Sequence, residues 1–587
     1  MFIYVLKRNT GLSFLRRQES IITSCLHRNK LNNWLRSQSI GFALVIIFQF
    51  VFLHFTSLSA QELLTAGVYK IEFTDKNQNS YQLSQPDQFL SFRALQRRQR
   101  QNIPLKTNDL PVSKFYTDSL QKMGLVVLNT SKWLNAASVH VSDTTLFRKL
   151  STVSFIKPYA NSLQVKENRH SDKFNEAYNP ITKSAADFYG ASYNQINLHH
   201  GDYLHGKGFR GQGMLIAVID AGFNNANNMS GFDSLWLQNR VKLAKDTYNP
   251  LADVFAEDSH GAMVLSTMAA TKAGSLVGTA PMADYVLLRS EIAITENLIE
   301  EFNWSVAAEL ADSLGADIIT SSLGYSQFDN PAMDHTYKDM NGRTTMVSRA
   351  AATASSKGMI VVSSAGNEGA SSWKYITAPA DADSILTVGA VNTSGVRASF
   401  SSVGPSFDRR VKPDIVSVGW GAMVQQPNGS IASVNGTSFS APIIAGLTAC
   451  LWQSSSGKKN MDIINAIKQS SSQYTNPDSL LGYGIPDFQR AYHLLNPIVR
   501  LGGKDIIAWP SPFTDELTIE FTSTTETLVS LEIYNVTGRK VFERQINTNV
   551  SDVNLITLTE LASFAKGLYI IKIKTNSQTF VCKVIKV

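Results

Sequence analysis

Three residues of this sequence form a possible set of carboxylate, base and nucleophile. Asp220 ends an apolar run, His260 lies in Asp-Ser-His-Gly, and Ser438 lies in Gly-Thr-Ser-Phe-Ser-Ala-Pro (436–442). A serine hydroxyl is a poor nucleophile at neutral pH, because it needs a base to take its proton and a carboxylate to orient that base. We therefore predict that Ser438 is a nucleophile, that His260 is its general base, and that Asp220 orients His260.

The residues around Ser438 favour a buried helix that starts close to the nucleophile. Gly436 allows a tight backbone path, and Pro442 is expected in the first turn, where its missing N–H costs nothing. Residues 441–451 are small and apolar nearly all round, which is typical of a buried helix. The amino end of such a helix presents N–H groups and a positive dipole, which suits a developing oxyanion.

These segments, in the chain order Asp, His, Ser, resemble the motifs of the subtilisin family of serine proteases over about 300 residues. The segment Ser-Ser-Ala-Gly-Asn-Glu-Gly (363–369) adds to the likeness, which implies that Asn367 and the Ser438 N–H bind the oxyanion. One position departs from the family, because Ala221 follows Asp220 where the family has Ser or Thr. The missing hydroxyl should weaken the orientation of the carboxylate without abolishing activity.

A substrate-binding edge is expected at Ser322, Leu323 and Gly324, which follow an apolar run. These residues resemble the family's edge strand, which pairs with an extended peptide. The resemblance implies no certain cofactor and no nameable metal site. Calcium is common in the family as a structural ion and is left open.

The elements that position these residues alternate between strand and helix from about residue 190 to 495. Continuous apolar strands separated by helices predict an α/β fold with a mainly parallel sheet covered on both faces, as in subtilisin. Active sites in such sheets lie at the carboxyl ends of strands, and Asp220 ends its strand directly. We assign the catalytic domain to residues 186–497. The predicted strands are 215–219, 285–288, 318–323, 359–362, 385–391 and 415–418, and the predicted helices are 261–270, 303–314 and 345–357.

Residues 61–175 are predicted to form a small α+β unit, and this unit resembles the propeptides of secreted bacterial subtilisin relatives. Such propeptides act as folding templates and cover the substrate cleft until they are cut. A helix is expected over 84–101, with Ser84 as its cap. Its four arginines are interpreted as a solvated face rather than a binding site. The polar stretch 165–190 is a plausible place for the cut.

The C-terminal residues 503–587 are predicted to form a small all-β sandwich with short strands and tight turns. Three motifs in order resemble the sorting domains of type IX secretion: Trp-Pro-Ser-Pro-Phe (509–513), 533–539 and 566–570. The alternative, a generic carbohydrate- or protein-binding sandwich, stays open.

The first 60 residues have the features of a secretory signal peptide. Arg36 precedes an apolar run over 40–55, and small residues follow it. The alternative is a retained membrane anchor, although the run is shorter than the roughly 20 residues that span a bilayer. This region holds a net charge of +6 of the chain's +7, so the basic pI near 9.0 indicates no nucleic-acid partner. With only three cysteines, the chain has no disulfide framework and must rely on its hydrophobic core.

Together these features predict a secreted or surface-exported serine endopeptidase that is made as a self-processing precursor. Its expected partners are protein or peptide substrates, its own propeptide and an outer-membrane secretion machinery. One alternative is a secreted binding protein on a catalytically silent subtilisin-like scaffold. A second is ester hydrolysis or peptide-bond formation by the same residues.

Overall fold

The structure is a computed structural model. It describes residues 67–143, 145–150, 152–157, 161–164, 173–174, 179–180, 188–496, 506–509, 511–523, 528–548, 552–574 and 579–587. The expected signal peptide at residues 1–60 lies outside these described residues. Within them, no helix is long and apolar enough to cross a membrane.

A seven-stranded sheet forms the centre of the block from residue 188 to 496, in the order β14-β13-β12-β11-β6-β10-β7. Every pairing in this sheet is parallel, which confirms the predicted fold class. The edge strand β7 is half exposed and lacks a continuous apolar run, so its sequence gave no strong signal. The strands are β6 (Leu215–Asp220), β7 (Val241–Asp246), β10 (Asp284–Arg289), β11 (Ile318–Ser321), β12 (Ile360–Ser364), β13 (Leu386–Val391) and β14 (Ile415–Val418).

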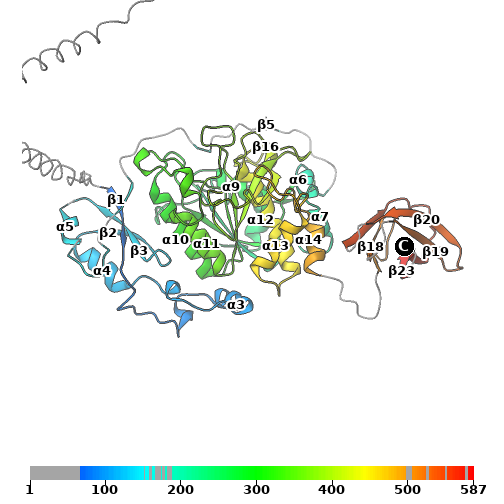
Figure 1. Ribbon diagram of the computed structural model, residues 1–587, viewed down its shortest axis with the longest axis horizontal. Helices are drawn as coiled ribbons and strands as arrows, with labels where there is room; N and C mark the ends of the chain where they lie inside the picture. Colours follow the sequence, from blue (N-terminus) through cyan, green and yellow to red (C-terminus); the bar gives the residue numbers. More distant parts are fainter. Residues whose placement is uncertain are drawn as a thin grey trace, which may run out of the picture. The chain divides into compact units, whose positions relative to one another are not determined.

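Helices cover both faces of this sheet, because alternate residues of each strand point to opposite sides. Ile216 and Val218 of β6 pack with α9, α12, α13 and α14, whereas Ala217 and Ile219 pack with α10 and α11. Figure 1 shows α10 and α11 on one side of the sheet and α12, α13 and α14 on the other. The helices are α9 (His260–Ala269), α10 (Leu298–Leu314), α11 (Met346–Ser356), α12 (Thr437–Ser454), α13 (Asn460–Ser470) and α14 (Phe488–Leu495).

Shorter elements complete this block. An antiparallel pair, β15 and β16, is extended by β5, and a second small hairpin is formed by β8 and β9. Their bounds are β5 (Asn179–Pro180), α6 (Tyr193–Asn197), α7 (Gly201–Gly206), α8 (Asp233–Leu237), β8 (Thr271–Lys272), β9 (Leu276–Val277), β15 (Trp420–Gln425) and β16 (Ile431–Asn435).

The N-terminal unit is an antiparallel four-stranded sheet, in the order β2-β3-β1-β4, with short helices. The helix expected over 84–101 is shorter than predicted. It begins at Phe92, because the Ser91 side chain accepts a hydrogen bond from the Ala94 N–H and caps it. The elements are β1 (Gly67–Glu72), α3 (Phe92–Gln101), α4 (Lys114–Lys122), β2 (Val126–Ser131), β3 (Ala136–Val141), α5 (Leu146–Leu150) and β4 (Asn161–Gln164).

The arginines of α3 do not all form a solvated face, so that expectation was wrong. Arg97 and Arg98 are 0% and 2% exposed. Both bind the carboxylate of Asp312 on α10, and Lys132 reaches the same carboxylate at 3.2 Å. Burial alone would raise the pKa of Asp312, but these three cations hold it well below its usual range.

A second buried carboxylate of α10, Glu309, binds the turn between β2 and β3. It accepts hydrogen bonds from the N–H groups of Lys132 at 2.7 Å and Trp133 at 3.0 Å, and from the Ser131 hydroxyl at 2.5 Å. Burial raises the pKa of Glu309. Helix α10 therefore binds the N-terminal unit through two buried carboxylates, those of Asp312 and Glu309, and that unit supplies their hydrogen-bond donors.

The C-terminal residues form two antiparallel sheets, β17-β18-β21 and β20-β19-β22-β23. Apolar side chains from both sheets, including Ile519 and Leu531, share one core, as expected for a sandwich. The strands are β17 (Ile506–Trp509), β18 (Leu517–Ser523), β19 (Leu528–Asn535), β20 (Lys540–Asn547), β21 (Asp552–Leu558), β22 (Gly567–Lys574) and β23 (Thr579–Lys586).

The contact between α3 and α10 predicts a large effect of Asp312→Asn, tested in a Ser438→Ala background that should keep the chain whole. The substitution removes the bound carboxylate of Arg97 and Lys132 and one of the two carboxylates of Arg98, which keeps Asp109, so the free energy of unfolding in urea should fall by about 3–5 kcal/mol. The matched control is Asp118→Asn, which removes an exposed ion pair with Lys114 and should change it by less than about 1 kcal/mol. Equal effects of the two substitutions would contradict this account of the interface.

The ion pairs of Asp312 also predict how the stability of the folded chain depends on pH. Because the pKa of Asp312 is depressed in the folded chain, its contribution should be present at neutral pH. It should be lost only as the pH falls below about 3.9, the ordinary pKa of an aspartate. Urea unfolding of the Ser438→Ala chain and its Asp312→Asn variant at pH 7 and pH 3 measures this, and the difference between them should shrink at pH 3. A constant difference would contradict it.

Candidate active site

Asp220 and His260 meet in a fully buried pair. Asp220 is the last residue of β6, and His260 is the first residue of α9. Oδ1 of Asp220 lies 2.7 Å from Nδ1 of His260, and both side chains are 0% exposed. A carboxylate at this distance can hold the imidazole in one tautomer, with its proton on Nδ1, and leave Nε2 to act as a base.

Two glycines allow the segments of Asp220 and His260 to approach this closely. A Cβ on Gly222 would lie 2.5 Å from the backbone nitrogen of Asp258. A Cβ on Gly261 would lie 2.4 Å from the Gly222 carbonyl oxygen and 2.9 Å from the Asp220 Cβ. Any side chain at either position would push the carboxylate and the imidazole apart.

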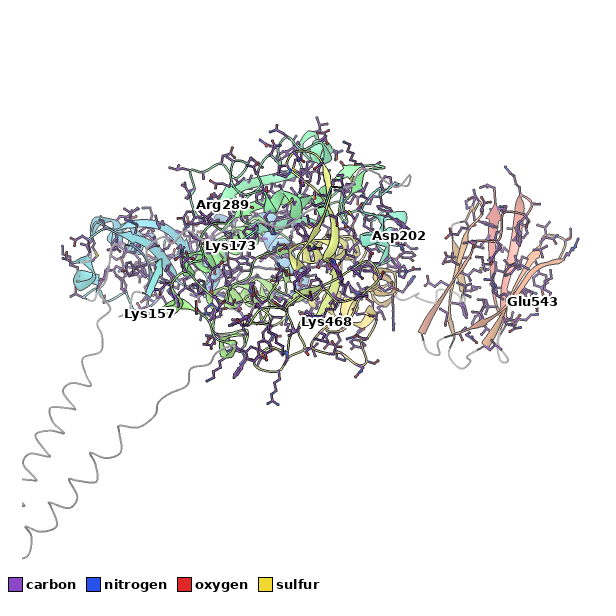
Figure 2. The ribbon with its side chains drawn as sticks, turned by 90° about the horizontal axis from the view of Figure 1, so that it is seen from above. Lys157, Lys173, Asp202, Arg289, Lys468 and Glu543 are labelled. Atoms are coloured by element: carbon purple, nitrogen blue, oxygen red, sulfur yellow. The ribbon has the colours of Figure 1, made fainter. Side chains whose placement is uncertain are left out.

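The surroundings of the Asp220 carboxylate show the consequence of Ala221. The Ala221 N–H donates to Oδ1 at 2.8 Å, whereas Oδ2 is buried without a hydrogen-bond partner among the described residues. Alanine at position 221 has no hydroxyl to donate to that oxygen. Arg289, labelled in Figure 2, supports the turn instead, because its Nε donates to the Ala221 carbonyl at 2.8 Å.

Ser438 lies inside the first turn of α12, which begins at Thr437. The expected place of Pro442 in the first turn was wrong, because the helix starts earlier and Pro442 is its sixth residue. Proline has no N–H, so it cannot donate to the carbonyl four residues before it, which is that of Ser438. The Ser322 hydroxyl donates to that carbonyl at 2.7 Å, and the Ser438 hydroxyl donates to the Ser322 carbonyl at 3.4 Å.

Asn367 is fixed in one orientation by Thr437. The backbone N–H of Thr437 donates to Asn367 Oδ1 at 2.9 Å, and the Thr437 hydroxyl lies 3.0 Å from the same oxygen. A backbone N–H can only donate, so the amide oxygen must point toward Thr437. The amide N–H₂ group therefore stays available as a donor.

A cavity of about 200 Å³ brings the other expected residues together. Ser438, Asn367 and all three residues of the predicted substrate edge line its wall. Leu323 and Gly324 directly follow Ser322 at the carboxyl end of β11. The candidate nucleophile, the amide donor and the predicted substrate edge thus face one space at the carboxyl ends of the parallel strands.

The short segment of Lys173 and Phe174 lies in this cavity, and the sequence carried no signal for it. The Phe174 ring packs on the His260 ring with 4.3 Å between their centroids. The Lys173 N–H donates to the carbonyl of Ala293 at 3.1 Å. Both residues belong to the region predicted to be a propeptide, so the end of that region covers the candidate base.

A group of three glutamates beside the cavity was also missed. The carboxylates of Glu291, Glu296 and Glu300 lie within 4.8 Å of one another, a spacing that could hold a metal ion. The ammonium of Lys173 binds all three. Their sequence spacing places them in a loop and in the start of α10, which is no recognisable metal motif.

Comparison with known proteins identifies three families along the chain. The subtilase family matches residues 211–484, the Bacteroidota peptidase S8 propeptide domain matches 68–176, and a secretion system C-terminal sorting domain matches 507–587. The first match contains Asp220, His260, Asn367 and Ser438. The second ends just after Phe174.

Individual relatives agree with these families. Subtilisin NAT of Bacillus subtilis subsp. natto is 29% identical over 291 residues, which cover 49% of this chain and 68% of that protein. A subtilisin of Bacillus pumilus is 28% identical over 290 residues, 49% of this chain and 94% of that protein. The epidermin leader peptide processing serine protease of Staphylococcus aureus shares the fold. The likeness has a TM-score of 0.50 and 17% identity, over 74% of this chain and 99% of that one.

The Ser322 hydroxyl donates to the buried carbonyl of Ser438. Ser322→Ala removes this donor, so we expect the free energy of unfolding to fall by about 1–3 kcal/mol. Pro442→Ala supplies an N–H to the same carbonyl, so it should restore much of this loss. Urea unfolding of the four chains of this double-mutant cycle measures the coupling. If Ser322→Ala lowers the free energy of unfolding equally in the parent chain and in the Pro442→Ala variant, this arrangement of hydrogen bonds is contradicted.

Proposed function

We propose that this chain, which matches the subtilase family, a propeptide domain and a C-terminal sorting domain, is an endopeptidase that releases its own propeptide. The observation that carries the proposal is the buried bond between Asp220 and His260, with a propeptide residue packed on the imidazole. On this proposal His260 is the general base, and Phe174 of the propeptide covers it until the propeptide is released.

The proposed reaction assigns one role to each of the four side chains. Ser438 Oγ attacks the scissile carbonyl carbon while His260 Nε2 takes the hydroxyl proton. The Ser438 N–H and the Asn367 side chain donate to the oxyanion of the tetrahedral intermediate. His260 then gives its proton to the leaving amine, and a water molecule repeats the sequence to release the acyl group from Ser438. Asp220 stabilises the imidazolium throughout.

The place of the propeptide supports an inactive precursor. Phe174 on His260 blocks the approach of another substrate, while the buried carboxylates of α10 hold the unit in place. An intramolecular cut near this segment would separate the unit from the catalytic domain. The matched propeptide domain ends at residue 176, inside the stretch 165–190 where a cut was expected.

The sorting domain implies secretion or display at the cell surface. We propose that a signal peptide in residues 1–60 takes the chain across the inner membrane, and that the C-terminal domain directs it through an outer-membrane machinery. The competing hypothesis is a silent binding protein, which would have no need for an intact set of four residues. Ester hydrolysis or peptide-bond formation would use the same set.

Fluorophosphonate labelling of a chain starting at Gln61 tests the proposed nucleophile. We expect a label on the parent chain and a fall in mass equal to the propeptide, with neither in the Ser438→Ala variant. Product analysis on peptides then separates hydrolysis from esterase or ligase activity. A parent chain that takes no label after deliberate removal of the propeptide would contradict the proposal and favour the binding protein.

Asn367→Ala tests the proposed oxyanion donor. Removal of one such donor lowers kcat by about 10²–10³-fold, a value known from a subtilisin, so we expect a loss of that size with little change in KM. The control is Asn227→Ala, which changes an exposed asparagine and should leave kcat within about twofold. A loss confined to KM would show that Asn367 binds the substrate rather than the transition state.

A further inference from the structure

An acidic pocket, formed by Glu291, Glu296 and Glu300, opens beside the catalytic residues. Glu291 follows β10 closely, and Glu300 lies in the first turn of α10. Glu291 and Glu300 are 2% and 0% exposed, and Glu296 is 21% exposed. Glu291 and Glu296 also line the cavity that contains Ser438 and Asn367, so the acidic pocket is continuous with the active site.

One cation from the propeptide occupies this pocket. The Lys173 ammonium donates to Glu296 at 2.8 Å, to Glu300 at 2.9 Å, and to Glu291. An ammonium has three N–H donors, and here each meets a different carboxylate.

The acidic pocket is electrostatically unfavourable when nothing compensates its carboxylates. Burial raises the pKa of Glu296 to about 8 and that of Glu300 well above its usual value, even with Lys173 present. Asp329 adds a further negative charge that faces Glu296. Buried carboxylates this close together are costly unless a cation or protons compensate them. The departure of Lys173 therefore leaves a site that takes up either another cation or protons.

The backbone beside the pocket shows how a substrate could enter. The Lys173 N–H donates to Ala293 at 3.1 Å, and the next residue, Phe174, packs on His260. A peptide in this position places one side chain in the acidic pocket and the following side chain against the catalytic base. The pocket is also held in shape, because the Tyr325 hydroxyl donates to Glu291 at 2.6 Å and Thr295 donates to Glu300 at 3.1 Å.

We propose that the acidic pocket is a specificity subsite for a lysine side chain of the substrate. In the processed enzyme, a substrate lysine replaces Lys173, and the next substrate residue packs on His260. Lysine is preferred over arginine, because three converging carboxylates match a compact ammonium better than a planar guanidinium. This inference rests on the proposed endopeptidase function and names its substrate class.

The test uses the full chain after it has processed itself, with fluorogenic peptides that differ at one position. That position carries lysine, arginine, norleucine or glutamate, and phenylalanine follows it. We expect kcat/KM for the lysine peptide to exceed that for the norleucine peptide by at least about tenfold, with arginine between them and glutamate lowest. Norleucine keeps the aliphatic chain and removes the charge, so the ratio isolates the ammonium.

Variants of the pocket make the test specific. Glu296→Gln should reduce the ratio of lysine to norleucine by about tenfold, and Glu296→Lys should abolish it by placing an ammonium in the pocket. The matched control is Asp233→Asn, which removes an exposed carboxylate at the start of α8 and should leave the ratio unchanged. In the precursor, Lys173→Met should slow the appearance of the processed chain.

The outcomes separate this inference from the proposed function, because fluorophosphonate labelling of the same preparation reports the nucleophile independently. Equal cleavage of the lysine and norleucine peptides by a labelled enzyme would overturn the subsite and leave the protease standing. A pocket that binds calcium, with calcium-dependent activity and no preference for lysine, would also overturn it. A preparation that neither takes the label nor cleaves any peptide would overturn both.

Discussion

The candidate active site depends on a hydrogen bond between a buried carboxylate and a buried imidazole, those of Asp220 and His260. A strand end and a helix start must approach closely enough to form it, and Gly222 and Gly261 make that approach possible. Parallel strands bring the remaining groups to the same edge of the sheet, where α12 begins at Thr437 and carries Ser438 in its first turn. The arrangement of the candidate site is therefore a consequence of sheet topology and of two positions without side chains.

A second constraint is the burial of negative charge on the catalytic domain. Cations of α3 and of the β2–β3 turn compensate the charge of Asp312, and Lys173 compensates the charge of the acidic pocket. All of these cations come from the propeptide region, so docking and blockage of the site share one electrostatic cause. The first contact holds the unit against α10, and the second places its end across the candidate base.

The local parts of this arrangement could be predicted from the sequence. Continuous apolar runs indicated the parallel strands, and short motifs indicated Asp220, His260 and Ser438, because each motif is complete within a few residues. The arginines of α3 were misjudged, because their partner Asp312 lies about 215 residues away. The role of Lys173 and the early start of α12 also depend on contacts between distant segments, which no local pattern contains.

The measurement that tests this account most directly is a crystal structure of the Ser438→Ala chain with its propeptide intact. The account predicts that Asp220 is hydrogen-bonded to His260, that the Phe174 ring packs on the imidazole, and that Lys173 sits among the three glutamates. A structure in which residues 173–174 lie away from the cleft, with the imidazole open to solvent, would contradict it.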